Sequence, residues 1–243
     1  MTHPVDARWT TLSTAAGTID AYLALPPAGR GPGLLMFQEI FGVNEHIRAV
    51  AEQYALDGFV VLAPDVFWRQ ERRVELGYEG ADRQRAVALM QGLVAPDKTA
   101  DLVSDIGACV AALRGLDEVA GARVGTIGWC LGGRLAYTAA AMSGVDAAVA
   151  YYGGGIHDAL HLVSGIECPI QFHYAGQDDH IPPPAVDRVR AAVAGKAAEV
   201  HVYPGSRHGF NCWARASYHP PSAALAHGRS VEFLARTLFG PLG

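Results

Sequence analysis

Short apolar runs alternate with longer segments of helical periodicity along most of the chain, and this alternation constrains the fold more than any other feature. The runs 33–39 and 59–65 are almost entirely apolar, which is typical of strands buried on both faces of a sheet. Parallel strands need crossover connections of about a dozen residues, and the helical segments supply them. The pattern therefore predicts an α/β protein with a mainly parallel central sheet and helices on both faces.

The predicted strands are 19–26, 33–39, 59–65, 122–128, 146–153, 169–176 and 198–204. The predicted helices are 45–56, 81–93, 98–114, 131–142, 184–194 and 221–239. The mixed, charged segment 66–80 is predicted to cross the surface.

Size and charge limit the classes of function. The 243 residues contain no repeat and no linker, so we expect a single domain over 1–243 and, at this size, a monomer. The net charge is −5, without a basic stripe, which argues against a nucleic-acid partner. We also expect no membrane association, because no apolar run approaches the roughly 18 residues of a membrane span and the N-terminus lacks the features of a signal peptide. Four widely spaced cysteines favour free thiols in a reducing cytoplasm.

The segment 126-TIGWCLGGRLAY-137 lies where a predicted strand gives way to a predicted helix. Within it Cys130 stands between Gly128 and Gly132, which corresponds to the G-x-S-x-G nucleophile elbow with cysteine in place of serine. The glycines avoid collisions in the sharp turn, and the helix directs its N-terminal amides at the sulfur, which favours a thiolate. We interpret Cys130 as a candidate nucleophile; a buried cysteine beside a tight turn is the alternative.

Two later strand ends carry the partners that such a nucleophile requires. An elbow of this kind is followed by an acid and then a histidine, each after a later strand. Asp178 follows the sixth predicted strand, and His208 follows the seventh. Because the carboxyl ends of parallel strands meet at one edge of the sheet, we predict a triad of Cys130, Asp178 and His208, with Asp179 as the alternative acid.

Five segments together resemble the dienelactone hydrolases (carboxymethylenebutenolidases), which are cysteine members of the α/β-hydrolase fold. The resemblance extends from about Tyr22 to the last predicted helix. Its segments are 38-QEIFGVN-44, 64-PDVF-67, 128-GWCLGG-133, 176-GQD-178 and 208-HGF-210.

The resemblance implies that Cys130 is the nucleophile, His208 the base and Asp178 its orienting acid. Glu39 corresponds to the family's glutamate that contacts the resting thiol. A carboxylate in that position opposes a permanent thiolate and so protects the sulfur from oxidation. The alternative for Glu39 is an ordinary surface carboxylate.

The resemblance also implies an oxyanion hole and a contact to the substrate. The backbone amides of Ile40 and Leu131 correspond to the oxyanion donors. Arg85 corresponds to an arginine that binds a substrate carboxylate. The alternative is a solvated helix charge, and Arg83 lies only two residues away.

The expected pocket departs from the family pattern. Cys212 stands where the family has its second carboxylate-binding arginine, and Arg215 follows three residues later. His180 replaces a phenylalanine, Gly209 a serine and Leu89 a tyrosine. Cys212, Arg215 and His180 are therefore candidate substrate contacts. The resemblance supports hydrolysis of an ester or lactone more strongly than dienelactone as the natural substrate.

Other patterns suggest ligands without sufficient support. The segment 157-HDALH-161 imitates a zinc motif but has an aspartate for the glutamate base and no third ligand, so we expect a solvated helix and no metal. The glycines 153–155 lack the rest of a phosphate-binding motif, and we expect no cofactor. Cys109 and Cys168 are expected to be packing residues, whereas Cys212 is expected near the base, either lining the pocket or able to form a disulfide with the nucleophile.

The sequence thus predicts a cofactor-free hydrolase of small carboxylic esters or lactones, acting through a thioester. The substrate is expected to bear a carboxylate. The alternatives are a non-catalytic protein of the same fold that binds small acids or has a regulatory role, and an esterase of different substrate range.

Overall fold

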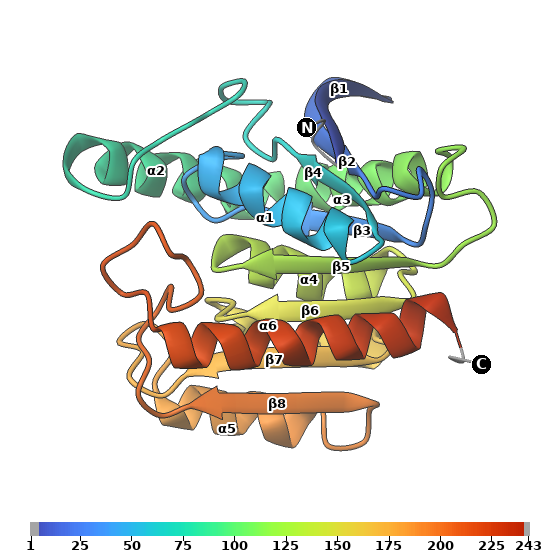
Figure 1. Cartoon of the computed structure of the whole chain (residues 1–243). Helices are drawn as coiled ribbons and strands as arrows, with labels where there is room; N and C mark the ends of the chain where they lie inside the picture. The colour runs from blue at the N-terminus through green and yellow to red at the C-terminus, as the bar shows by residue number, and fades with distance from the viewer. Residues whose placement is uncertain (1–4, 241–243) are drawn as a thin grey trace.

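Eight strands form one sheet in the order β1-β2-β4-β3-β5-β6-β7-β8 in the computed structural model, which describes residues 5–240 (Figure 1). β1 and β2 form an antiparallel hairpin, and β2 pairs antiparallel with β4. All later neighbours are parallel. The strands are β1 (Asp6–Thr14), β2 (Gly17–Leu25), β3 (Gly33–Phe37), β4 (Val60–Pro64), β5 (Val124–Trp129), β6 (Ala147–Tyr151), β7 (Ile170–Ala175) and β8 (Ala198–Tyr203).

Helices cover both faces of this sheet. α1 and α6 lie on the face toward the viewer in Figure 1, and α4 and α5 lie behind it. The helices are α1 (Glu45–Leu56), α2 (Gly80–Leu93), α3 (Thr99–Arg114), α4 (Leu131–Met142), α5 (Pro183–Ala192) and α6 (Pro220–Leu234). Short 3₁₀ turns occupy Pro96–Lys98, Ile156–Asp158 and Leu160–Gly165, and α6 continues as a π-helical turn over Ala235–Phe239. The predicted fold class is confirmed.

The central strands form the buried core of the protein. Every residue of β3, β4, β5, β6 and β7 is buried, as expected for parallel strands covered on both faces. Within residues 5–240, no helix is both long and apolar enough to cross a bilayer.

The strand β1 was not predicted. Its side chains are mostly exposed or half-buried, because it lies at the edge of the sheet and packs against a single neighbour. An edge strand of this kind carries little of the apolar signal by which strands are recognised.

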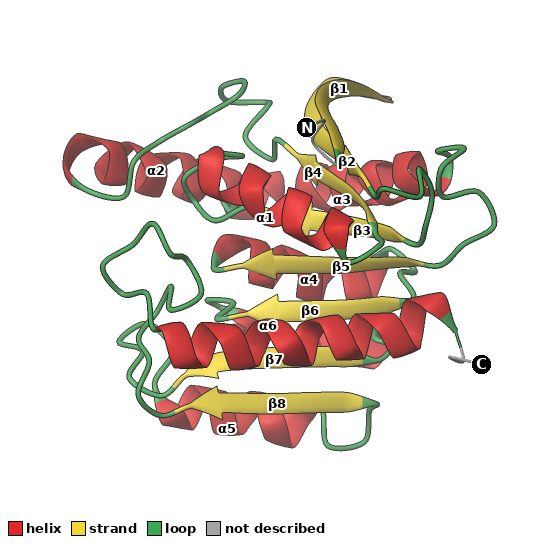
Figure 2. Cartoon of the chain, in the orientation of Figure 1, coloured by secondary structure: helices red, strands yellow, loops and turns green. Residues whose placement is uncertain are grey.

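The segment 66–79 runs over the sheet edge without helix or strand, as predicted, but it is anchored into the core. Phe67, Val74 and Leu76 are buried. Asp65, at the end of β4, accepts hydrogen bonds from the amides of Phe67 and Arg73 at 3.1 and 2.6 Å. These contacts hold the segment against the core. It leads into α2, which lies toward the sheet edge formed by the carboxyl ends of β5 to β8 (Figure 2).

Candidate active site

Cys130 sits on a strained turn between β5 and α4. Its backbone has φ 56° and ψ −115°, a left-handed region that residues other than glycine rarely adopt. The turn is held because the Cys130 amide donates to the carbonyl of Tyr151 on the neighbouring strand at 3.0 Å. The side chain is partly exposed and lines a cavity. The sulfur is therefore raised out of the sheet and accessible.

Two glycines allow this turn to form. A Cβ at Gly128 would lie 2.1 Å from the carbonyl oxygen of Gly132, and a Cβ at Gly132 would lie 2.2 Å from that of Phe37. Both separations are far inside van der Waals contact. The glycines thus let the first turn of α4 pack directly on the backbone that leaves β3.

This close packing sets two backbone amides beside the cavity. Ile40, in the loop after β3, and Leu131, the first residue of α4, both line it together with Cys130. Within the part of the chain that the structure describes, neither amide has a hydrogen-bond acceptor. Two unused donors next to a thiol are the arrangement that can stabilise an oxyanion.

Asp178 and His208 are joined across the loops after β7 and β8. Nδ1 of His208 lies 2.7 Å from Oδ2 of Asp178. The other carboxylate oxygen accepts the amides of His180 and Ile181 at 2.9 and 3.2 Å, so the acid is fixed from both sides. Asp178 is buried, whereas the alternative acid, Asp179, is exposed. The imidazole is therefore oriented by Asp178.

Charges around His208 shift its pKa strongly. Burial alone would lower the pKa of this imidazole, but the interactions with Cys130 and with the carboxylate of Asp178 outweigh burial and raise the pKa to about 10. For Asp178, burial would raise the pKa of the carboxyl, yet His208 holds it below its usual range. The surroundings of His208 thus favour its protonated form.

Glu39 is held by Arg215. Its Oε1 accepts from Nη1 of Arg215 at 2.8 Å, and both side chains are largely buried. The resemblance led us to expect a contact of Glu39 with the resting thiol; the hydrogen bond that the structure gives its carboxylate goes to Arg215. A Cβ at Gly209 would lie 2.4 Å from the guanidinium of Arg215. The glycine at this position therefore makes room for the arginine.

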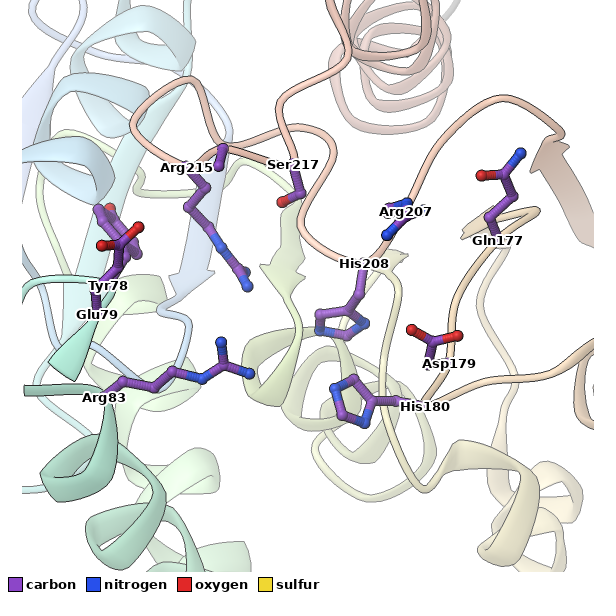
Figure 3. Close-up of a pocket in the computed structure, with 11 residues that line it drawn as sticks. Tyr78, Glu79, Arg83, Gln177, Asp179, His180, Arg207, His208, Arg215 and Ser217 are labelled. Atoms are coloured by element: carbon purple, nitrogen blue, oxygen red, sulfur yellow. The ribbon is translucent and has the colours of Figure 1, made fainter.

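Two cavities that share lining residues lie at this edge of the sheet, and we call them the inner and the outer lobe. The inner lobe, of about 420 Å³, includes Cys130, Ile40 and Leu131. The outer lobe, of about 250 Å³, is bounded by Tyr78 and Asp179 among others and is drawn in Figure 3. Both volumes suit small molecules. The side chains that line both lobes are Arg83, His180, His208 and Arg215.

Of the two arginines on α2, Arg83 and not Arg85 lines the cavity. Arg85 is exposed and pairs with Glu71 at 2.5 Å, whereas the guanidinium of Arg83 points toward His208 and His180 in Figure 3. Two residues along a helix correspond to a rotation of about 200°. Arg83 shares a helix face with Val87 and Met90, which also line the cavity. The helical spacing of these three residues is therefore the sequence signal that identifies Arg83 as the arginine facing the cavity.

Cys212 is buried beneath the outer lobe and does not line either lobe. Its Sγ donates to the hydroxyl of Tyr78 at 3.5 Å, and the same hydroxyl accepts from Nδ2 of Asn44 at 3.0 Å. All four cysteines are free. Cys212 thus supports the wall of the pocket from behind.

The segment His157–His161 does not form an α-helix. It is split between two 3₁₀ turns, so its two histidines do not share one helical face. Across residues 5–240, no group of three or more His, Cys, Asp or Glu side chains is placed to hold a metal ion.

The model of the dienelactone hydrolase family matches residues 19–238. The chain belongs to the dienelactone hydrolase family. It is accordingly an ester hydrolase of the α/β-hydrolase fold.

This dienelactone hydrolase family member is similar to the following two relatives in sequence and to one solved structure. A carboxymethylenebutenolidase from Pseudomonas putida is 32% identical over 222 residues, covering 90% of this chain and 91% of the relative. A provisionally assigned carboxymethylenebutenolidase from Azospirillum brasilense is 36% identical over 225 residues, covering 91% and 95%. A crystal structure from Klebsiella pneumoniae, provisionally assigned as a dienelactone hydrolase, aligns with a TM-score of 0.84 at 30% identity over 96% of this chain and 99% of that one.

Proposed function

We propose that this family member hydrolyses small carboxylic esters or lactones, of the carboxymethylenebutenolide type, with Cys130 as the nucleophile, His208 as the proton carrier and Asp178 as its orienting acid. The observation that carries the proposal is the Asp178–His208 hydrogen bond of 2.7 Å, largely shielded from solvent, next to a cysteine on a strained, glycine-flanked turn. Each of these features alone is common. Their combination at one sheet edge is the arrangement that nucleophilic acyl transfer needs.

In the proposed reaction the Cys130 sulfur attacks the ester carbonyl carbon, and the amides of Ile40 and Leu131 donate to the oxyanion that forms. Collapse of this intermediate breaks the bond to the leaving oxygen, which takes a proton from His208, and leaves a thioester on the sulfur. His208 then removes a proton from water, the hydroxide attacks the thioester, and the acid product departs from the regenerated thiolate.

We further propose that the substrate bears a carboxylate on its leaving half, bound by Arg83 and Arg215. Both arginines line the lobe that extends beyond His208, which is the side toward which a leaving group protonated by His208 must lie. Arg215 uses Nη1 for Glu39, and a guanidinium has further donors to offer. His180, which stands edge-on to His208 with ring centroids 5.3 Å apart, borders the same lobe.

The four free thiols are consistent with a reducing compartment such as the cytoplasm. A sulfur nucleophile that is accessible from a cavity would be lost to oxidation elsewhere. The free thiols therefore support the expected cytoplasmic location.

The test is Cys130→Ala, compared with Cys168→Ala as a matched control at a buried thiol. We expect Cys130→Ala to lower kcat/KM for aryl esters and lactones by about 10⁴-fold or more, as for removal of a nucleophile from a triad. Quenched wild-type protein should show an added acyl mass on the peptide that contains Cys130. Hydrolysis at the wild-type rate by Cys130→Ala would reject the mechanism, and tight binding of a small acid without any turnover in wild type would favour a non-catalytic role.

A further inference from the structure

Arg134 is a cation in the inner lobe that has no ion-pair partner among the residues that the structure describes. It lies one helical turn after Cys130 in α4, is half-buried and lines the cavity. Within residues 5–240, no carboxylate lies within ion-pair distance of its guanidinium, and that guanidinium makes no hydrogen bond. Arg215, in contrast, is neutralised by Glu39. A half-buried guanidinium without a partner is costly, so the inner lobe is suited to an anion.

The backbone directs this guanidinium toward the cavity. Helical side chains tilt toward the N-terminus of their helix, and the N-terminus of α4 is Cys130. The guanidinium lies over Gly155, where an added Cβ would come within 3.2 Å of Nη1. Gly155 has φ 78° and lines the same lobe. Gly155, the last of the three glycines that matched no phosphate motif, therefore leaves room for the Arg134 guanidinium.

Arg134 borders the inner lobe and not the outer lobe. The same holds for Gly154 and Gly155, whereas His208 borders both lobes. The leaving half of a substrate must lie toward His208 in order to receive its proton. The acyl half then remains in the inner lobe, which Arg134 lines.

We infer that Arg134 binds a carboxylate at the far end of the substrate's acyl half, so that the preferred substrates are half-esters of short dicarboxylic acids. The inference rests on the proposed function for its assignment of acyl and leaving sides. Val87, Met90 and Val94 form an apolar wall of the same lobe, which suits a short hydrocarbon chain between the scissile carbonyl and the terminal charge.

The lobe favours a carboxylate over a phosphate dianion. Two guanidinium groups without an ion-pair partner among residues 5–240 line this lobe, those of Arg83 and Arg134. Arg83 also borders the outer lobe, whereas Arg134 lines the inner lobe alone, and the paired N–H groups of Arg134 match a carboxylate. Asp158 lines the lobe as well, with its oxygens 3.4 Å from His157 and 3.7 Å from Arg188. A second negative charge on the ligand would be repelled by that carboxylate.

The experiment compares two aryl esters of equal acyl length, the 4-nitrophenyl monoester of adipic acid and 4-nitrophenyl hexanoate. The measured quantity is the ratio of kcat/KM for the anionic ester to that for the neutral ester, with spontaneous hydrolysis subtracted. We expect Arg134→Gln to lower this ratio roughly 10- to 100-fold, the loss typical of a charged hydrogen-bonded contact. Arg134→Lys should lower it less, because it retains the charge. Arg85→Gln, at the exposed arginine outside the cavity, is the matched control and should leave the ratio at the wild-type value.

A ratio that does not change in Arg134→Gln would overturn the inference, and so would a fall of equal size in Arg85→Gln. If Arg134→Gln does not fold, the Arg134→Lys ratio and calorimetric binding of adipate decide: adipate should bind to Cys130→Ala and bind measurably more weakly when Arg134→Lys is added, because the bidentate geometry is lost while the charge remains. Unchanged adipate binding in the double variant would overturn the inference. Because this binding needs no turnover, a failure of the subsite is distinguished from a failure of the proposed catalysis, which is tested by Cys130→Ala alone.

Discussion

At the scale of single residues, the loop after β7 treats two adjacent aspartates differently: Asp178 is buried and Asp179 is exposed. Strand order identified Asp178 and His208 as partners, but it could not separate Asp178 from Asp179, because adjacent loop residues differ only in which way the backbone turns them. Burial and two backbone amides settle that direction. Arg85 was preferred to Arg83 from the resemblance, although only Arg83 lies on the face of α2 that lines the cavity. Which of two neighbours faces a site depends on packing that no motif records.

The pKa of His208 provides a prediction at this scale. Cys130 makes the largest contribution that raises it, so Cys130→Ala should lower the pKa of His208 from about 10. Nuclear magnetic resonance titration of the His208 ring measures this shift. Cys168→Ala, as the control, should leave the pKa of His208 unchanged. A pKa that stays near 10 in Cys130→Ala would mean that Asp178 alone holds the proton.

At the scale of elements, the helices and central strands were predictable because their apolar periodicity is strong. All predicted strands and helices are present with boundaries close to those expected. The strand β1 was missed because its side chains face solvent at the sheet edge. The anchoring of 66–79 was missed because three buried side chains scattered along an irregular segment have no period. The contact between α4 and β3 was also not predicted, although the sequence contains the glycine that permits it, Gly132.

That contact predicts opposite effects for two glycine substitutions in helices. Gly132→Ala would place a Cβ 2.2 Å from the carbonyl of Phe37, so it should lower the free energy of unfolding by about 3 kcal/mol or more. Gly107→Ala, in α3 with no atom within 4 Å of the new Cβ, should raise it by about 0.5 to 1 kcal/mol. Urea denaturation measures both changes. Equal stability of the two variants would show that α4 is free to move away from β3.

At the scale of the whole molecule, buried titratable groups should give stability a maximum near neutral pH. Burial lowers the pKa of His46 to about 4 and that of His173 well below its ordinary value, and the pKa of His227 is also lowered by burial. The folded state therefore binds fewer protons than the unfolded chain below pH 6.5, and stability falls as pH falls. Asp65, whose pKa burial raises to about 6, acts in the opposite direction. His208, with a raised pKa, stabilises fully below about 6.5 and loses that contribution as pH rises toward 10.

We therefore expect the free energy of unfolding to peak at about pH 6.5 to 7. On the acid side it should fall by up to about 1.4 kcal/mol per pH unit for each neutral buried histidine, less the opposing effect of Asp65. Urea unfolding at a series of pH values measures the curve. His46→Gln should flatten its acid limb, whereas His161→Gln, at an exposed histidine, should not. A stability that keeps rising below pH 5 would contradict the pKa shifts.

The chain lines the cavity with groups from two separate sources. The thiol, the carboxylate and the imidazole come from the ends of β5, β7 and β8, which are fixed by the sheet. The arginines and the apolar wall come from α2, from the body of α4 and from the loop before α6. Substitutions on the second set can alter which acids are recognised while the reacting groups keep their positions. Such a division allows related proteins to accept different substrates while they keep the same catalytic reaction.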